Sequence, residues 1–141
     1  MRRWVSISPR AVERLLDYGR LHAESGVERI GVLVGCGDLI ADAVEMTLES
    51  SQHHAVLDDG RLLQLLQTLD GRSYVIGWWH THRDDPYPSH LDVRTQEGWQ
   101  ALYEDSIAAT VSAERMIVLL WRVEDGRPLI VREVKLRDVE R

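Results

Sequence analysis

Two histidines separated by one residue, His80 and His82, have the spacing that most directly suggests chemistry. They end an apolar run that is predicted to be a β-strand, and side chains on a strand alternate between its two faces. Both imidazole rings therefore point to the same side, where they could bind one metal ion. Asp92 offers a third ligand, because a helix is expected to begin at Ser89 and its first turn would bring the carboxylate back toward the histidines.

This set of ligands is typical of a catalytic zinc ion. Two imidazoles and one carboxylate leave a fourth position for water, whereas four protein ligands close a structural zinc site. Zinc at that position would polarise both the water and a substrate carbonyl group. Hydrolysis also needs a general base that lies near the metal without binding it. The 23 acidic residues leave the choice of base open, although Glu28, at the start of a predicted neighbouring strand, would be conveniently placed.

Each of these residues also has a simpler structural explanation. A histidine pair at a strand end is more often structural or exposed than catalytic. Ser89 alone is a helix N-cap, and Asp92 alone is a favourable charge in the first turn of a helix. Glu28 alone is an ordinary charge at a strand edge. The metal site is favoured only because all these positions occur together in one register.

The elements that must position these residues alternate between strands and helices. Ser8 followed by Pro9 is typical of a helix N-cap and a first helical position. We expect strands at 3–8, 28–35, 38–47, 73–80, 107–111, 116–124 and 128–136, helices at 9–26, 61–72 and 89–103, and a polar loop at 50–60. Because strand pairs outnumber strand–helix–strand units, the predicted fold class is α/β, with a mixed, curved β-sheet and helices packed on it.

Length and charge limit the alternatives. The 141 residues fit one domain, predicted over 1–141, and a net charge of −6 argues against nucleic acid or an anionic membrane as the main partner. The one cysteine, Cys36, suits a reducing compartment, and no signal peptide or membrane span is predicted, so the expected location is cytoplasmic. We expect Cys36 to be a small buried residue and His22 to lie on a helix surface.

The whole pattern resembles the JAMM (MPN+) metalloprotease family. His80-Thr-His82, preceded by IGWW and followed by a loop and Ser89-x-x-Asp92, is similar to the motif of that family. The stretch ERIGVLVG at 28–35 is similar to the family's upstream strand, and LDVRTQEGWQALY is similar to the helix after the motif in the proteasome-lid deubiquitinase and the signalosome deneddylase. The resemblance covers essentially the whole chain and implies an MPN, cytidine-deaminase-like architecture.

The resemblance implies a role for each matching residue. His80, His82 and Asp92 would bind one Zn²⁺ per chain, with a catalytic water. Glu28 would hold that water as general base and then protonate the leaving amine, and Ser89 would help stabilise the oxyanion. The family cleaves isopeptide or peptide bonds after the C-terminal glycine of ubiquitin or ubiquitin-like proteins. The expected partners are a ubiquitin-like protein or its conjugates, together with E1-like and E2-like proteins of the same pathway.

Two features depart from the family pattern. Six residues separate His82 from Ser89, one fewer than the family usually has, and Arg83 stands where the family usually has proline. Arg83, Asp84 and Asp85 also make this rim more charged than in most relatives, and we hypothesise that they contact the substrate tail. The short connections near Gly71 and after Tyr103 indicate a compact, prokaryotic-type member.

Two alternative functions stay open at this point. The same chemistry could trim the C-terminus of a sulfur-carrier protein, in which case sulfur-transfer enzymes, not E1-like and E2-like proteins, would be encoded nearby. The chain could instead be a non-catalytic MPN scaffold that only binds partners. Scaffolds of that kind have usually lost metal ligands, so the metal content of the purified protein would separate the two classes.

Overall fold

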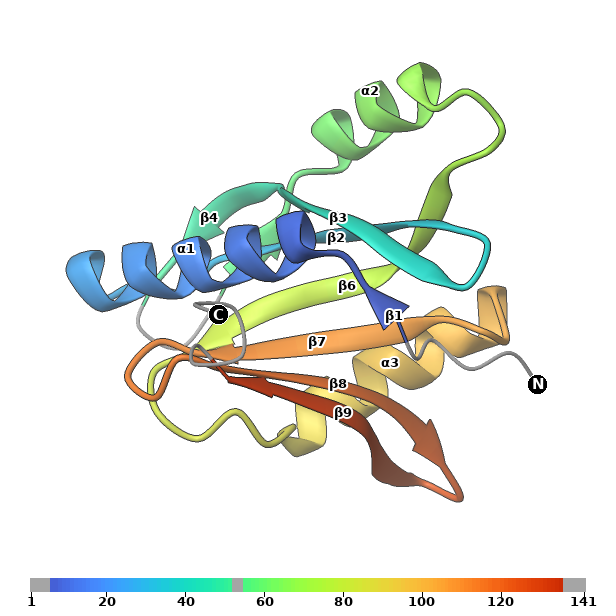
Figure 1. Ribbon diagram of the computed structural model, residues 1–141. Coiled ribbons are helices and arrows are strands. Elements are labelled where there is room, and N and C mark those ends of the chain that lie inside the picture. The colour runs from blue at the N-terminus through green and yellow to red at the C-terminus, as the bar shows by residue number, and fades with distance from the viewer. Residues whose placement is uncertain (1–5, 52–54, 136–141) are drawn as a thin grey trace.

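The computed structural model describes residues 6–51 and 55–135 (Figure 1). Their elements are β1 (Ser6–Ile7), α1 (Pro9–Ser25), β2 (Ile30–Cys36), β3 (Leu39–Glu45), β4 (Thr47–Ser50), β5 (Ala55–Leu57), α2 (Asp59–Thr68), β6 (Tyr74–His82), α3 (His90–Leu102), β7 (Ile107–Ser112), β8 (Ile117–Glu124) and β9 (Arg127–Lys135). The order follows the predicted one, with β4 and β5 as additions. Residues 3–5 of the first predicted strand lie outside the described residues.

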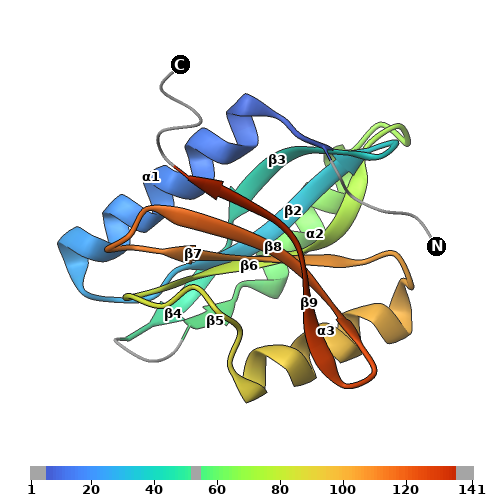
Figure 2. The ribbon, with the colours of Figure 1, turned by 60° about the horizontal axis from the view of Figure 1, so that its bottom comes forward.

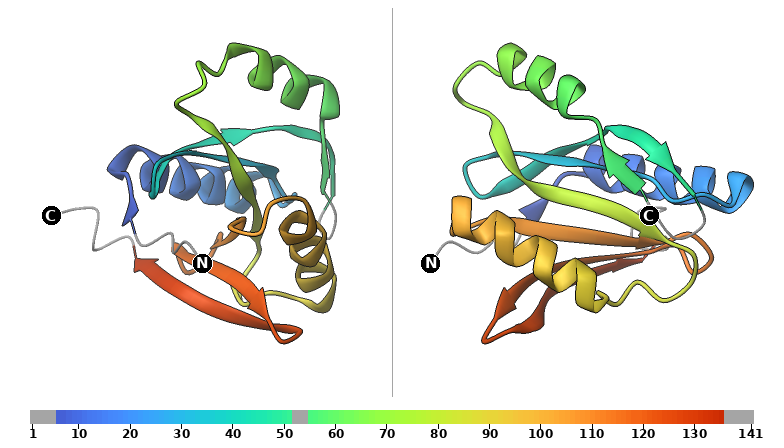
Figure 3. Two further views of the ribbon diagram at one scale, coloured as in Figure 1. Left: turned by 90° about the vertical axis from the view of Figure 1, so that its right-hand side faces the viewer. Right: turned by 180° about the vertical axis from the view of Figure 1, so that it is seen from behind.

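Seven of these strands form one sheet in the order β1-β3-β2-β6-β7-β8-β9, so β6 lies in the middle. The pairs β1–β3 and β6–β7 are parallel, and the other neighbours are antiparallel. Figure 3 shows the curvature of the sheet from the side, and the register shifts in three of its ladders are irregularities that bend and twist strands. The predicted mixed, curved sheet with helices packed on it is confirmed.

Each face of the sheet has its own apolar core. Helix α1 covers one face and α3 covers the other (Figures 2 and 3). Trp78 and Trp79, adjacent on β6, point to opposite faces, and Trp79 belongs to the core under α1 while Trp78 belongs to the core under α3. The buried residues of the second core are Trp78, Val93, Ala108, Leu119, Trp121 and Val123. Strand β6 is therefore held on both faces as well as at both edges.

The ends of α1 follow the predicted chemistry. Ser8 Oγ accepts a hydrogen bond from the Ala11 N–H at 3.0 Å, and Pro9 occupies the first turn. Gly26 ends the helix with a φ of 74°, and its N–H donates to the His22 carbonyl at 2.7 Å. In the part of the chain that the structure describes, no helix combines the length and the apolar character that crossing a membrane requires.

The segment predicted as the polar loop 50–60 is different in the structure. There, β4 and β5 pair with each other as a separate two-stranded sheet, and the predicted strand 38–47 is interrupted at Met46. Both strands are too short to show a period of two in the sequence, and they are stabilised by pairing with each other and by contacts with the start of β2. Helix α2, which lies at one side of the molecule in Figure 1, ends at Thr68, three residues before the Gly71 turn. None of its residues is buried.

We expect Gly77→Ala to prevent stable folding, because a methyl group there would lie 1.6 Å from the Ile107 carbonyl oxygen of β7. The clash is with backbone in the middle of the sheet, so the free energy of unfolding should fall by about 4 kcal/mol or more. Gly98→Ala in α3 is the matched control. A methyl group at Gly98 meets nothing within 4 Å, and this variant should gain about 0.5–1 kcal/mol. Urea unfolding of both variants measures the difference, and equal stabilities would contradict this account of β6.

Candidate metal centre

Three side chains that lie apart in the sequence converge at one end of β6. His82 Nε2 lies 2.8 Å from His80 Nε2 and 3.0 Å from Asp92 Oδ2, and His80 Nε2 lies 3.0 Å from Asp92 Oδ1. Both histidines point to the α3 face of β6, as their alternation predicts, and Asp92 lies in the first turn of α3. Among the described residues, this is the group of histidine and carboxylate side chains that could hold a metal ion.

The spacing of the ligand atoms fits a small divalent cation. Tetrahedral zinc with bonds of about 2.0 Å separates its ligand atoms by roughly 3.3 Å. The distances of 2.8–3.0 Å between the three side chains differ from this value by a few tenths of an ångström. Small rotations of the side chains would therefore admit the ion without any change in the backbone.

The neighbours of His82 fix its tautomer. Its Nδ1 lies 2.7 Å from the Asp85 carbonyl oxygen, which can only accept a hydrogen bond, so Nδ1 carries the proton. The lone pair of Nε2 is then directed toward His80 and Asp92. Metal-binding histidines commonly donate their second ring nitrogen to a carbonyl or carboxylate in this way, which orients the ring.

His80 is held by packing. Its ring stacks on Trp78, with centroids 4.9 Å apart and an interplanar angle of 18°, and the Trp78 Nε1–H donates to Gln96 Oε1 of α3 at 2.9 Å. The His80 Nδ1 atom is buried, and within the described residues it has no hydrogen-bond partner. A buried polar atom without a partner is costly, so the ring keeps this position because Trp78 and Asp92 hold it there.

Asp92 is fixed by the start of α3 and stays ionised. Ser89 and Asp92 form a capping box, in which the Asp92 N–H donates to Ser89 Oγ at 3.2 Å and the Ser89 N–H donates to Asp92 Oδ2 at 2.9 Å. Burial alone would raise the pKa of Asp92, but hydrogen bonds with His80 and His82 outweigh it and hold that pKa well below its usual range. The ligand set therefore includes one permanent negative charge.

The pKa values of the two imidazoles shift in opposite directions, although both rings contact Asp92. Burial lowers the pKa of His80, so this ring is neutral. Burial also acts to lower the pKa of His82, but the hydrogen bonds with Asp92 and with the Asp85 carbonyl raise it above the ordinary value. Without a metal, a proton on His82 is thus stabilised by Asp92. A site that stabilises one positive charge in this position is chemically suited to a metal cation.

Glu28 lies in the same pocket without being one of the converging ligands. A pocket of about 400 Å³ is lined by Glu28, Ile30, Ala55, Trp78, His80, His82, Arg83, Ser89, Leu91, Asp92 and Thr95. Glu28 precedes β2, and its N–H donates to the Ser51 carbonyl at 2.8 Å. Burial raises the pKa of the Glu28 carboxyl to about 7, although the charge of His82 opposes the shift. Such a carboxyl can both accept and donate a proton near neutral pH.

Ser89 is a helix cap, and its hydroxyl proton is not used by the cap. Among the described residues, the contact of its Oγ is the hydrogen bond that it accepts from the Asp92 N–H, and the side chain lines the pocket. The hydroxyl O–H is therefore able to donate to a molecule bound in the pocket. The structure brings all five predicted site residues to one place. Ser89 is the predicted helix N-cap and also lines the pocket.

The loop between His82 and Ser89 is short but well anchored. The Ala113 and Glu114 N–H groups donate to the carbonyls of His82 and Arg83 at 2.8 and 3.0 Å, and the Thr110 hydroxyl donates to the Pro86 carbonyl. Arg83 Nε lies 3.2 Å from Glu114 Oε1. Although this loop is one residue shorter than the family pattern, Ser89 and Asp92 still lie beside the histidines.

Two expectations from the sequence are wrong. Cys36, expected to be buried, is exposed at the end of β2, because the chain turns away from the sheet at Gly37. His22, expected on a helix surface, is only 2 % exposed. It lies on the apolar face of α1, three residues after the buried Gly19, and the helical period of 3.6 could have indicated this.

The chain matches a known family model and known folds. The model described as JAB1/Mov34/MPN/PAD-1 ubiquitin protease matches residues 2–105. No curated protein matches the chain. The solution structure of protein DSY2949 from Desulfitobacterium hafniense is similar, with a TM-score of 0.65, 17 % identity, and coverage of 95 % of this chain and 97 % of that one. The crystal structure of AF2198, a JAB1/MPN domain protein from Archaeoglobus fulgidus, has a TM-score of 0.57, 15 % identity, and coverage of 88 % and 94 %.

The structural neighbours share the fold at low sequence identity, and the family model covers most of the chain, including every residue of the converging site. Because the family model matches well over half of the chain, the chain belongs to the JAB1/Mov34/MPN/PAD-1 ubiquitin protease family.

Proposed function

We propose that the protein is a zinc-dependent peptidase or isopeptidase that cleaves after the C-terminal glycine of a ubiquitin-like protein. One observation carries the chemistry. His80 and His82 have their Nε2 atoms 2.8 Å apart, and each Nε2 lies 3.0 Å from one oxygen of Asp92. These three side chains share an open pocket with a half-buried carboxyl whose pKa is about 7. The choice of a ubiquitin-like substrate rests on membership of the family.

Each residue has a defined task in this proposal. His80, His82 and Asp92 would hold Zn²⁺, and the ion would supply Lewis-acid polarisation of the scissile carbonyl and the attacking water. Glu28 would accept a proton from that water at its carboxylate and then deliver it to the departing nitrogen. The Ser89 hydroxyl would donate a hydrogen bond to the oxygen of the scissile carbonyl as negative charge develops there.

The surface around the pocket suits a polypeptide substrate. Next to it, a hollow of about 610 Å³ between α2 and α3 is lined by uncharged residues: Leu62, Leu66, Val75, Thr95, Gly98, Trp99, Leu102 and Tyr103. Thr95 lines both hollows, so the two adjoin. Leu102 is 91 % exposed and Leu66 is 49 % exposed, and apolar surface of this kind favours contact with another chain. The proposed setting is the cytoplasm, with the ubiquitin-like protein or its conjugates as partner.

The protein should bind close to one zinc ion per chain when it is purified without chelator. His80→Ala and Asp92→Ala should each lose the metal, because two ligands cannot hold it tightly. His90→Ala is the matched control, since His90 is exposed beside the same motif and is not one of the converging ligands. Elemental mass spectrometry measures the zinc content. A full zinc content in either ligand variant would rule out this site.

Hydrolysis should depend on Glu28. The assay is a panel of ubiquitin-like proteins, ubiquitin included, each carrying a fluorogenic amide on its C-terminal glycine. At least one of them should be cleaved by the zinc-loaded protein, and Glu28→Gln should lower kcat by about 10³-fold while the zinc content is unchanged. If Glu28→Gln cleaves as fast as the natural chain, the proposed base is wrong. If the zinc-loaded natural chain cleaves none of the panel, the scaffold alternative is favoured.

Glu28 should also lower the stability of the metal-free protein above neutral pH. Folding raises its pKa from 4.5 to about 7, so the folded state favours the protonated carboxyl, and stability is lost as pH rises through this range. Glu28→Gln should therefore be more stable than the natural chain at pH 8, by at most about 3 kcal/mol because solvent reaches part of the carboxyl, and about equal at pH 4.5. Urea unfolding in chelator measures both. Glu97→Gln, exposed on α3, is the control and should change neither value.

A further inference from the structure

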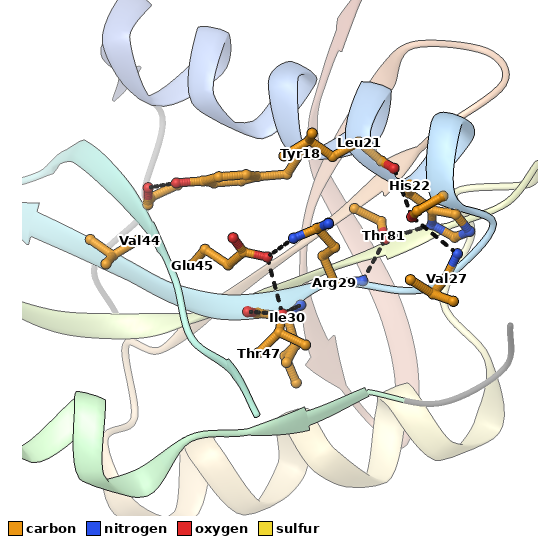
Figure 4. A network of polar contacts seen from close by, with 12 residues as sticks. Tyr18, Leu21, His22, Val27, Arg29, Ile30, Val44, Glu45, Thr47 and Thr81 are labelled. Atoms are coloured by element: carbon orange, nitrogen blue, oxygen red, sulfur yellow. Dashed lines mark hydrogen bonds and ion pairs between the residues drawn. The ribbon is translucent and has the colours of Figure 1, made fainter. Parts of the chain in front are cut away.

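The hydroxyl of Thr81 connects three segments behind the metal ligands. Thr81 lies between His80 and His82 on β6, and its side chain points to the opposite face, where it is fully buried. Its Oγ1 lies 2.6 Å from His22 Nδ1 of α1, and it accepts a hydrogen bond from the Arg29 N–H at 2.9 Å (Figure 4). One hydroxyl thus joins the metal-ligand strand to the end of α1 and to the residue that follows Glu28.

The directions of both hydrogen bonds at the Thr81 hydroxyl follow from its neighbours. The Arg29 N–H can only donate, so Thr81 Oγ1 accepts there, and its own proton is free for His22. Burial lowers the pKa of His22, which keeps the ring neutral and leaves Nδ1 able to accept. His22 is itself fixed, because its carbonyl accepts the hydrogen bond from Gly26 that ends α1. The network therefore has one well-defined arrangement.

The backbone that carries Glu28 is bonded to several different segments. The Glu28 N–H donates to the Ser51 carbonyl, and the Arg29 carbonyl accepts from the Thr81 N–H at 2.9 Å. Ile30 donates to Thr47 Oγ1 at 3.0 Å and accepts from the Met46 N–H at 2.9 Å. Among these bonds, the pair between Arg29 and Thr81 is the one that links Glu28 directly to the strand of the histidine ligands.

The side chain of Arg29 fastens the same segment on its other side. Its Nη1 donates to Glu45 Oε2 at 2.6 Å, and Thr47 Oγ1 lies 3.3 Å from the same oxygen (Figure 4). Both Arg29 and Glu45 are about a quarter exposed, so this ion pair is shielded from most of the solvent. The ion pair holds the Arg29 side chain to Glu45 of β3, while the N–H of Arg29 is directed at Thr81.

We propose that Thr81 and His22 are positioning residues that set the location of the Glu28 carboxylate relative to His80, His82 and Asp92. The inference rests on the proposed function, in which Glu28 acts beside the metal. Neither residue touches the pocket: Thr81 fixes the segment of Glu28 against β6, and His22 fixes the orientation of the Thr81 hydroxyl. A shift of a few tenths of an ångström in this segment would alter the distance between the Glu28 carboxylate and a water held by a bound metal.

A double-mutant cycle with Co²⁺ tests this inference without a substrate. Co²⁺ binds zinc sites and reports its surroundings by visible absorption, so both affinity and spectrum can be measured for the natural chain, Thr81→Val, Glu28→Gln and the double variant. Thr81→Val has nearly the same shape and lacks the hydroxyl. It should weaken Co²⁺ binding about tenfold and change the spectrum when Glu28 is present, but change affinity less than about twofold in the Glu28→Gln background.

Conservative variants separate positioning from general damage. Thr81→Ser keeps the hydroxyl and should retain the affinity and the spectrum of the natural chain. His22→Asn places an oxygen acceptor near the position of Nδ1 and should also retain them, whereas His22→Leu should behave as Thr81→Val does. The inference is overturned if Thr81→Val has the same effect with and without Glu28, if it has no effect at all, or if Thr81→Ser fails to restore the natural values.

Hydrogen exchange of the metal-free protein distinguishes failure of this inference from failure of the proposed function. The Arg29 amide should exchange at least about tenfold faster in Thr81→Val than in Thr81→Ser or the natural chain, because its acceptor is lost. If the natural chain binds no Co²⁺, the proposed function fails. If it binds Co²⁺ and the Arg29 amide exchanges equally in all variants, the positioning role of Thr81 fails alone.

Discussion

The pairing of β6 with β2 on one side and β7 on the other is the constraint on which the site depends. Its ladders place His80 opposite Ile30 of β2 and Thr110 of β7, so the direction of both histidines is fixed by backbone hydrogen bonds to two strands. A slip of one residue would exchange the faces of β6 and move both imidazoles to the α1 side. Gly77 enforces this register, because only a residue without a side chain allows the Ile107 backbone so close.

The two faces of β6 then have different chemistry. On the α3 face, Trp78, His80 and His82 follow one another from the core to the pocket, and α3 contributes Asp92 from its first turn. On the α1 face, Trp79 continues the larger core, where it stacks on Tyr18 with centroids 4.4 Å apart. The strand thus separates the open pocket from an apolar core by the thickness of one sheet.

The sequence predicted most of this arrangement, because the main elements have strong local patterns. The cap at Ser8, the apolar run before His80 and the N-cap at Ser89 each determine structure over a few residues, and all three were predicted correctly. The hairpin of β4 and β5 was missed, since its strands have only four and three residues and depend on each other. His22 and Thr81 were not recognised as a pair, because residues 59 positions apart meet only through the packing of α1 on the sheet.

The metal-free pocket contains an electrostatic imbalance that a cation would relieve. Asp92 is ionised and His80 is neutral. Among the described residues the buried His80 Nδ1 has no hydrogen-bond partner, and the hydrogen bond with Asp92 raises the pKa of His82. Proton and metal therefore compete for the same lone pair on His82, and metal binding should release a proton. Glu28 is part of this balance: in the folded chain its carboxyl is held toward neutrality by burial, and a nearby dication would favour its ionised form. The same charge that completes the ligand set would thus also convert the neighbouring carboxyl into a base.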